Sequence, residues 1–278
     1  MKKIIYLLIF LVVSSCAVED DFIESQEVTD TIEEVSSKTM KPVTLIKAWD
    51  HNMNLDSGET FFLKKFTVKV ANLGYEKKVS IYHKKQSGDW GEIPLSYSFN
   101  IDDQSEIWTT RLQTIGTEYV KEFVVKYEVN GKTYWDNNNG ENYWVFTRPQ
   151  GYRFGDNLKV SVDQEFSKIY YHSNQKRSFN ILVDVKGNIG DNKEVGVVYT
   201  TDNWASYQFL SLEPRSDYGP VPGYYVISPN YFGIERWHNS VLIDKEVDAV
   251  EYAVVYKVDG VDYWDNNYGR NYRISKEF

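Results

Sequence analysis

Two aromatic, asparagine-rich strings contain the residues of this chain that are best suited to contact a ligand. The first, YWDNNNGENY, spans Tyr134 to Tyr143, and the second, YWDNNYGRNY, spans Tyr263 to Tyr272. Tryptophan offers a flat apolar face together with an N–H donor, and asparagine amides both donate and accept hydrogen bonds. Neither string holds a nucleophile, a metal-binding cluster or a phosphate-binding loop. This combination favours a neutral, polyhydroxylated ligand over covalent chemistry.

The other polar candidates do not support catalysis. Asp136 and Asp265 each stand alone in their strings, whereas glycoside hydrolysis generally uses two carboxylates flanking one bond. The segment DNNNGEN resembles an EF-hand loop only superficially, because Gly140 occupies the place of a required acidic or amide ligand. The histidines lie at unrelated places in the two halves of the chain: His51, His83, His172 and His238. We therefore expect no enzymatic activity, no metal and no cofactor.

Composition narrows the class of protein and of partner. The 278 residues are 16% aromatic with only 7 Pro and 17 Gly, which suits packed β-sheet better than disorder or a helical bundle. The net charge of −9 argues against nucleic acid and anionic membrane surfaces, because both need a basic footprint. A chain of this length that repeats a string once favours two domains.

The first fifteen residues, 1–15, have the pattern of an export signal. Lys2 and Lys3 precede an apolar run, Ile4 to Val13, that is too short to span a bilayer. The segment VSSC that follows resembles the cleavage and lipidation box of a bacterial lipoprotein, in which Cys16 would become the acylated first residue. An ordinary secretory signal with a chance cysteine is the alternative. Cys16 is the single cysteine of the chain, so a disulfide within the molecule is excluded.

Residues 16–40 are expected to form a flexible acidic tether, because they are rich in Asp, Glu, Ser and Thr and poor in large apolar residues. The acidic run Glu19 to Asp21 is similar to signals that send lipoproteins of some Gram-negative bacteria to the outer face of the cell. A plain solvated linker is the alternative. We expect an outer-membrane lipoprotein, anchored to the membrane by lipid and exposed at the cell surface.

Short alternating runs with no helical periodicity predict an all-β fold of two tandem, immunoglobulin-like antiparallel β-sandwiches. We place them at residues 41–146 and 157–278, joined by a connector at 147–156 that contains Pro and Gly. The predicted strands begin at Val43, Phe66, Lys78, Glu106 and Glu122 in the first sandwich and at Phe179, Glu194, Val250 and Tyr272 in the second.

Each string follows a predicted hairpin. Asn130-Gly131 and Asp259-Gly260 are strong signals for a two-residue type I′ turn. Pairing across the first turn places Tyr127 opposite Tyr134 and Lys126 opposite Trp135, so Trp135 shares a face with polar residues.

The second hairpin gives the same division for Trp264, with less contrast. We expect both tryptophans to face water, although a loop folded over each ring would make it core. Trp108 and Trp237 lie in apolar runs and are expected in the core. The three consecutive asparagines of the first string can either build the turn or contact a ligand. We expect both roles among Asn137, Asn138 and Asn139.

The segments VKVANLGYEKKVSIYH and KEFVVKYEVNGKTYWDNNNGENYWV, read together, resemble carbohydrate-binding module family 21. This family includes the starch-binding domain of certain fungal glucoamylases and the glycogen-targeting domain of phosphatase regulatory subunits. The resemblance covers about residues 41–146 and, more loosely, 157–275. It implies an immunoglobulin-like β-sandwich that binds α-1,4-linked glucans without cleaving them.

Carried over to this sequence, the resemblance implies a first site of Trp135, Asn137 and the loop residue Trp90. The second copy supplies Trp264, Asn266 and Trp204. A further site in fungal members corresponds to Tyr75 and Lys77. In the second copy Asp191 replaces that tyrosine and only Lys193 remains, so the further site there is expected to be weak or absent.

We therefore expect a non-catalytic protein that binds starch or glycogen and works beside glycan-degrading enzymes and a transporter. Phosphatase targeting is not expected, because the chain has no basic-x-Val-x-Phe docking segment and the signal directs it out of the cytoplasm. The alternative is a surface adhesion or scaffold protein that uses its sandwiches for protein contacts. Such a protein would have no reason to keep the same aromatic residues twice.

Overall fold

The computed structural model describes residues 41–54, 58–115, 119–146, 151–215 and 226–275. Within these ranges the regular elements are antiparallel strands and two short 3-10 turns, η1 (Asn138–Gly140) and η2 (Gly187–Ile189). The all-β antiparallel prediction is therefore confirmed. The predicted signal and tether, including Cys16, lie outside the described residues.

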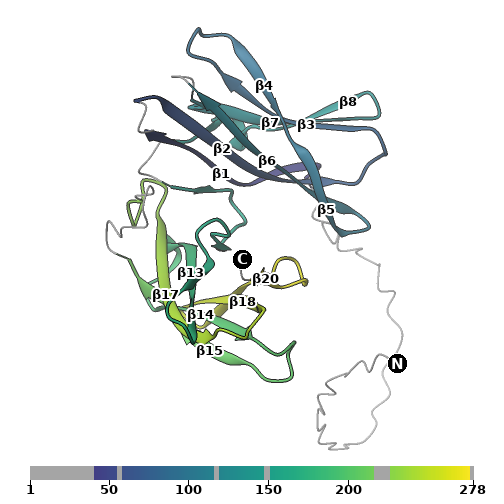
Figure 1. The fold of residues 1–278 in the computed structure, drawn as a ribbon. Coiled ribbons are helices and arrows are strands. Elements are labelled where there is room, and N and C mark those ends of the chain that lie inside the picture. The colour runs from purple at the N-terminus through teal and green to yellow at the C-terminus, as the bar shows by residue number, and fades with distance from the viewer. Residues whose placement is uncertain (1–40, 55–57, 116–118, 147–150, 216–225, 276–278) are drawn as a thin grey trace, which may run out of the picture. The chain divides into compact units, whose positions relative to one another are not determined.

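The first half of the chain forms two five-stranded sheets that face each other across an apolar core (Figure 1). One sheet has the order β10-β1-β2-β6-β5, and the other the order β4-β3-β7-β8, with β9 also pairing with β7. The strands are β1 (Val43–Asn54), β2 (Thr60–Ala71), β3 (Lys77–Lys84), β4 (Trp90–Pro94), β5 (Ser96–Asp102), β6 (Ser105–Ile115), β7 (Glu122–Val129), β8 (Lys132–Asp136), β9 (Tyr143–Trp144) and β10 (Arg153–Phe154).

The second half has a similar sheet order. One sheet runs β11-β13-β17-β16, with β12 also pairing with β13, and the other runs β15-β14-β18-β19, with β20 also pairing with β18. The strands are β11 (Val160–Val162), β12 (Lys168–Tyr171), β13 (Lys176–Lys186), β14 (Lys193–Thr200), β15 (Gln208–Ser211), β16 (Glu213–Pro214), β17 (Ile234–Asp244), β18 (Ala249–Val258), β19 (Val261–Asp265) and β20 (Tyr272–Ser275).

Alternation along the strands decides which side chains fill each core. On β7, Phe123, Val125 and Tyr127 are fully buried, while the residues between them form the outer row. Trp237 is buried in the second core as expected, and Trp108 is partly buried against the first. Each core is thus made from the inward rows of two facing sheets.

Both predicted hairpins have the expected register. Lys126 pairs with Trp135 and Tyr127 with Tyr134, and the second hairpin pairs Val255 with Trp264. The turns have positive φ at both central residues, as a type I′ turn requires: Asn130 (51°), Gly131 (72°), Asp259 (47°) and Gly260 (80°). These turns fix which face each motif tryptophan occupies.

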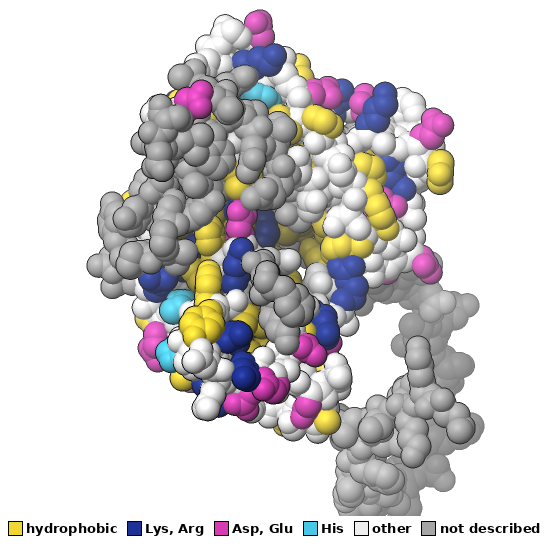
Figure 2. All heavy atoms as spheres, in the orientation of Figure 1, with side chains coloured by type: hydrophobic (Ala, Val, Ile, Leu, Met, Phe, Trp, Pro, Cys, Tyr) yellow, Lys and Arg dark blue, Asp and Glu magenta, His cyan; other side chains and the backbone are white. Residues whose placement is uncertain are grey.

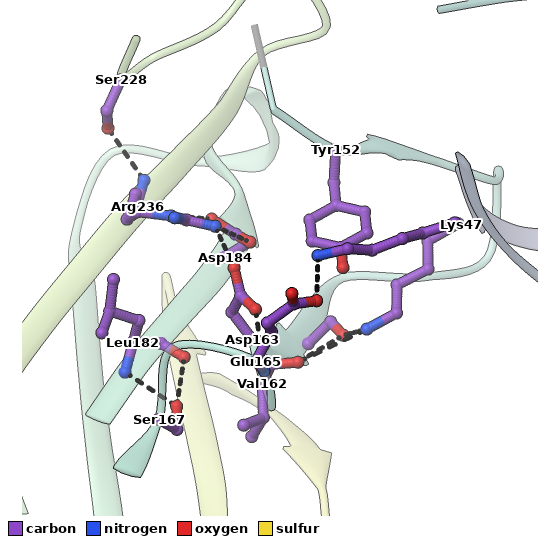
Figure 3. A network of polar contacts seen from close by, with 12 residues as sticks. Lys47, Tyr152, Val162, Asp163, Glu165, Ser167, Leu182, Asp184, Ser228 and Arg236 are labelled. Carbon is purple, nitrogen blue, oxygen red and sulfur yellow. Dashed lines mark hydrogen bonds and ion pairs between the residues drawn. The ribbon is translucent and has the colours of Figure 1, made fainter. Parts of the chain in front are cut away.

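A polar network lies on the face of β13 that points away from the second core (Figure 3). Arg236 of β17 donates two hydrogen bonds of 2.8 Å to Asp184 of β13 and one of 2.6 Å to Asp163. Burial alone would lower the pKa of Arg236, but the two carboxylates raise it. Nearby, Lys47 of β1 donates to Ser161 Oγ at 2.8 Å. The arginine is therefore a fully charged, buried centre with two acidic partners.

Asp50 of β1 provides a pH-dependent contribution to stability. It is fully buried, it accepts a hydrogen bond from Val120 N, and burial raises its pKa to about 6 despite Lys64 at 3.8 Å. A raised carboxyl pKa means that stability is present at low pH and is lost as pH rises from about 4 to about 6.

We expect Asp50→Asn to remove this dependence. The unfolding free energy of the variant, relative to the parent protein, should rise by about 2 to 3 kcal/mol between pH 4 and pH 7. Urea unfolding across this pH range measures the difference. A difference that is constant with pH would contradict the assignment.

Candidate functional site

The outer row of β7 and the strands beside it carry the first group of predicted site residues. Trp135 of β8 lies opposite Lys126 and is 48% exposed, so the motif tryptophan faces water as expected. Trp90, at the start of β4, lies opposite Lys84 at the end of β3. The register therefore brings the loop tryptophan and the motif tryptophan to the same face of one sheet.

Tyr82 of β3 joins the two tryptophans. Its ring is stacked on Trp90 with centroids 5.0 Å apart, and it makes an edge-to-face contact with Trp135 with centroids 5.7 Å apart. We call these three rings the first aromatic surface. At its side, Lys126 lies 5.9 Å from the Trp135 ring centroid and donates to Glu92 at 2.8 Å. That hydrogen bond lowers the pKa of Glu92 and raises the pKa of Lys126, so both groups are charged at neutral pH.

The second group of predicted residues lines an open pocket of about 330 Å³. Trp204 and Trp264 stand beside a floor made by Val198 and Ala253, which are paired across β14 and β18. Trp264 is 54% exposed and Trp204 38% exposed. We call this pocket the second aromatic surface, whose remaining lining residues are Asn266 and Asn271. The side chains on its floor are small and leave an open space. In the first half, Tyr82 fills the corresponding space.

Trp204 is placed by a tight turn instead of by a strand. Asn203 and Trp204 both have positive φ, and Asp202 accepts hydrogen bonds from Thr200 Oγ1, Ser206 N and Ser206 Oγ. These bonds, with those from Ser206 first, lower the pKa of Asp202 to about 2. The Trp204 indole N–H donates to Glu251 at 2.8 Å, which orients the ring.

Some asparagines of the two strings stabilise the turn, and some also have an amide group that is available at the surface. Asn137 Oδ1 accepts a hydrogen bond from Gly140 N at 3.1 Å, and Asn266 Oδ1 accepts one from Gly269 N at 2.9 Å. Within the described residues, neither amide nitrogen has a hydrogen-bond partner, so each NH₂ group is free to donate outward. Asn138 has a structural role, because its amide nitrogen donates to Asn142 O at 2.9 Å.

The aspartate of each string anchors it to the opposite sheet. Asp136 is buried and accepts hydrogen bonds from Leu45 N of β1 at 2.7 Å and from Tyr143 Oη at 2.9 Å. Asp265 accepts in the same way from Val162 N and Tyr272 Oη. Burial first, and then the adjacent aspartate, raises the pKa of both tyrosines, which therefore stay protonated donors. These carboxylates hold the turn in place and are not available to a ligand.

The further site implied by Tyr75 and Lys77 lies away from the first aromatic surface. Tyr75 is 99% exposed, whereas Lys77 belongs to the inward row of β3 and forms an ion pair of 2.8 Å with Glu106 of the facing sheet. In the second half, Lys193 is held in the same manner by Glu235 at 2.5 Å. Both lysines are engaged by a carboxylate.

Three residues at or near the two aromatic surfaces were not predicted as site residues from the sequence. Tyr82 lies on the outer row of β3, which the alternation of that strand indicates in retrospect. Asn271, the third asparagine of its string, lines the second aromatic surface. Trp144 directly follows the first string and is 38% exposed. All three could have been identified from the sequence by following the outer face of the sheet along each strand and through the turn next to it.

Charged side chains of both signs are mixed on the face that Figure 2 draws. Basic and acidic side chains are interspersed over the described part of the face in Figure 2, with no single broad basic patch. Among the described residues, no helix is long and apolar enough to cross a membrane.

Both antiparallel sandwiches display indole faces together with amide groups that can donate and accept hydrogen bonds. The family model for a carbohydrate/starch-binding module (family 21) matches residues 51–146 and 164–275. The chain therefore belongs to carbohydrate-binding module family 21.

Relatives share this module in different settings. Glucoamylase 1 of Rhizopus oryzae is 41% identical over 105 residues, which are 34% of this chain and 16% of the enzyme. Human protein phosphatase 1 regulatory subunit 3B is 32% identical over 114 residues, 35% of this chain and 39% of that protein. The chain thus spans well under half the length of these relatives, and the match to the enzyme covers only its non-catalytic binding module.

One solved structure is similar in sequence to part of this chain. The starch-binding domain of Rhizopus oryzae glucoamylase, in complex with β-cyclodextrin and maltoheptaose, is 35% identical. The match covers 39% of this chain and 96% of that domain, with a TM-score of 0.30.

Proposed function

We propose that this protein binds α-1,4-linked glucan, such as starch or glycogen, without cleaving it, through two tandem copies of the family 21 module. One observation carries the proposal. Each half presents an exposed motif tryptophan on the outer face of a sheet, beside a second tryptophan and an asparagine amide that is free to donate. The rings would stack on glucose units while the amides would bind their hydroxyl groups.

One such surface is a weak site by itself. Covering one indole face with a sugar ring removes roughly 60 to 80 Å² of apolar area, about 1.5 to 2 kcal/mol. Two rings and a few hydrogen bonds, offset by the ordering of ligand and side chains, give a dissociation constant of roughly tens of micromolar to millimolar. A single module would therefore hold a polymer poorly.

Two modules on one chain compensate for this weakness. Once the first surface has bound a long glucan, the second contact is intramolecular, and the apparent affinity rises by roughly 10² or more when both sites reach the polymer. The gain requires a ligand long enough to bridge the two surfaces. It should be absent with short oligosaccharides.

The proposed location is the cell surface. A lipid on Cys16 and an acidic tether at residues 16–40 would hold the two modules near the outer membrane. There the protein would retain glucan for neighbouring glycan-degrading enzymes and a transporter. The phosphatase regulatory subunits among its relatives associate the same module with protein partners. A scaffold that uses the sandwiches for protein contacts is the second candidate.

Affinity electrophoresis in native gels tests the proposal. We expect the protein to be retarded in gels containing amylopectin or glycogen and to migrate normally in gels containing dextran or xylan, whose linkages differ. Unretarded migration through both α-1,4-glucans would overturn the proposal and favour the scaffold.

A further inference from the structure

Trp144 lies on the same face as the first aromatic surface but outside it. It belongs to β9, where it pairs with Glu122 of β7. Glu122 and Lys126 both lie on the outer row of β7, and Lys126 pairs with Trp135. The two tryptophans are therefore separated by four residues along β7, roughly 13 Å. This distance suits contacts to different units of one short oligosaccharide.

A pocket of about 240 Å³ lies at Trp144. Its other walls include Gln86 of the β3–β4 loop, Tyr119, Lys121 and Glu122. The Lys121 ammonium lies 5.6 Å from the Trp144 ring centroid. The pocket thus combines two aromatic rings, an amide and four charged side chains, since Lys84 and Lys85 also line it. Aromatic faces beside polar groups are the mixture that binds a sugar with its hydroxyl groups.

The turn of the first string connects this pocket with the first aromatic surface. Asn142, which ends the turn, donates from its amide nitrogen to Glu122 Oε1 at 2.8 Å. Asn137, with its free amide nitrogen, lies at the other end of the same turn. The loop that supplies Gln86 continues to Trp90. The turn between Trp135 and Trp144 therefore carries a polar side chain at each of its ends.

We propose that Trp144 and its pocket form an additional glucose subsite, which extends the glucan site of the first half beyond Trp90 and Trp135. This proposal rests on the proposed function of the first aromatic surface. It assigns to that surface a preference for longer chains. The ligand is an α-1,4-linked oligosaccharide long enough to reach from Trp135 to Trp144.

The second half does not offer the same extension. Arg273 occupies the position that Trp144 has in the first half, opposite Glu251 of β18. Its guanidinium forms an ion pair of 2.5 Å with Glu251, which also accepts the Trp204 indole N–H. An arginine held in this way offers no exposed ring. The two halves are therefore expected to differ in their dependence on chain length.

Titration calorimetry with maltotriose and maltoheptaose tests the subsite. The full chain with Trp264→Ala serves as the parent, because it isolates the first half. We expect the parent to bind maltoheptaose more tightly than maltotriose. Adding Trp144→Ala should weaken maltoheptaose binding by about 10- to 30-fold, the value of one covered indole face, and leave maltotriose unchanged. Trp144→Arg, which copies the second half, should act in the same way.

The control is Arg273→Ala in the same parent, which should change neither affinity. Thermal unfolding of each variant shows whether the sandwich is intact. A Trp144→Ala protein that is folded and keeps the full preference for maltoheptaose would overturn the subsite alone. Failure of the parent and of the unmodified protein to bind either sugar would instead overturn the proposed function.

Discussion

Replacing both motif tryptophans should abolish glucan binding. In the Trp135→Ala/Trp264→Ala protein, retention on glycogen is expected to fall by at least 10²-fold, because each aromatic surface loses its most exposed ring and the two-site enhancement disappears. Each single variant keeps one intact surface. We expect single variants to bind short oligosaccharides at half the stoichiometry and to lose most of their affinity for the polymer.

Calorimetry with maltoheptaose and sedimentation with glycogen measure these effects. Tyr171→Ala is the matched control, since Tyr171 is an exposed aromatic residue of β12, outside both aromatic surfaces. It should bind like the unmodified protein. A double variant that still binds glycogen normally would show that the tryptophans are not the binding surface.

The largest effect on stability is expected from Arg236→Ala. The variant leaves Asp163 and Asp184 buried with their arginine removed, and breaking a buried ion pair in this way costs about 3 to 5 kcal/mol. Urea unfolding followed by tryptophan fluorescence should show a lower midpoint. If unfolding proceeds in two steps, the second half, which contains all three residues, should be the part that unfolds earlier.

Lys176→Ala is the matched control, because it removes an ion pair that is exposed instead of buried. Lys176 forms an ion pair of 2.5 Å with Asp244, but both side chains are exposed, so its loss should cost about 1 kcal/mol or less. Equal effects of the two substitutions would contradict the role that burial gives to Arg236.

The strand registers that place the motif tryptophans follow from local sequence. Asn130-Gly131 and Asp259-Gly260 specify type I′ turns, and a two-residue turn fixes every pair of the hairpin that it closes. The outward direction of Trp135 and Trp264 could therefore be predicted without a tertiary structure. The resemblance to a known family added the loop residues Trp90 and Trp204, which spacing alone does not connect to the strings.

Contacts between distant segments could not be predicted in this way. Asp136 binds Leu45 N of the facing sheet, and nothing near the string indicates that partner. The bonds of Arg236 to Asp163 and Asp184 likewise join three segments that are far apart in sequence. Tyr82 fills the floor that Val198 leaves open in the second half, a difference that depends on side-chain packing across strands.

The most direct test of the central claim observes the indoles themselves. The chain has eight tryptophans, and labelling their indole N–H groups for NMR gives each its own signal, assigned by single substitutions. On addition of maltoheptaose, the signals of the exposed Trp135 and Trp264 should shift, while that of the fully buried Trp49 should not. Saturating maltoheptaose that leaves both exposed signals unchanged would contradict the account.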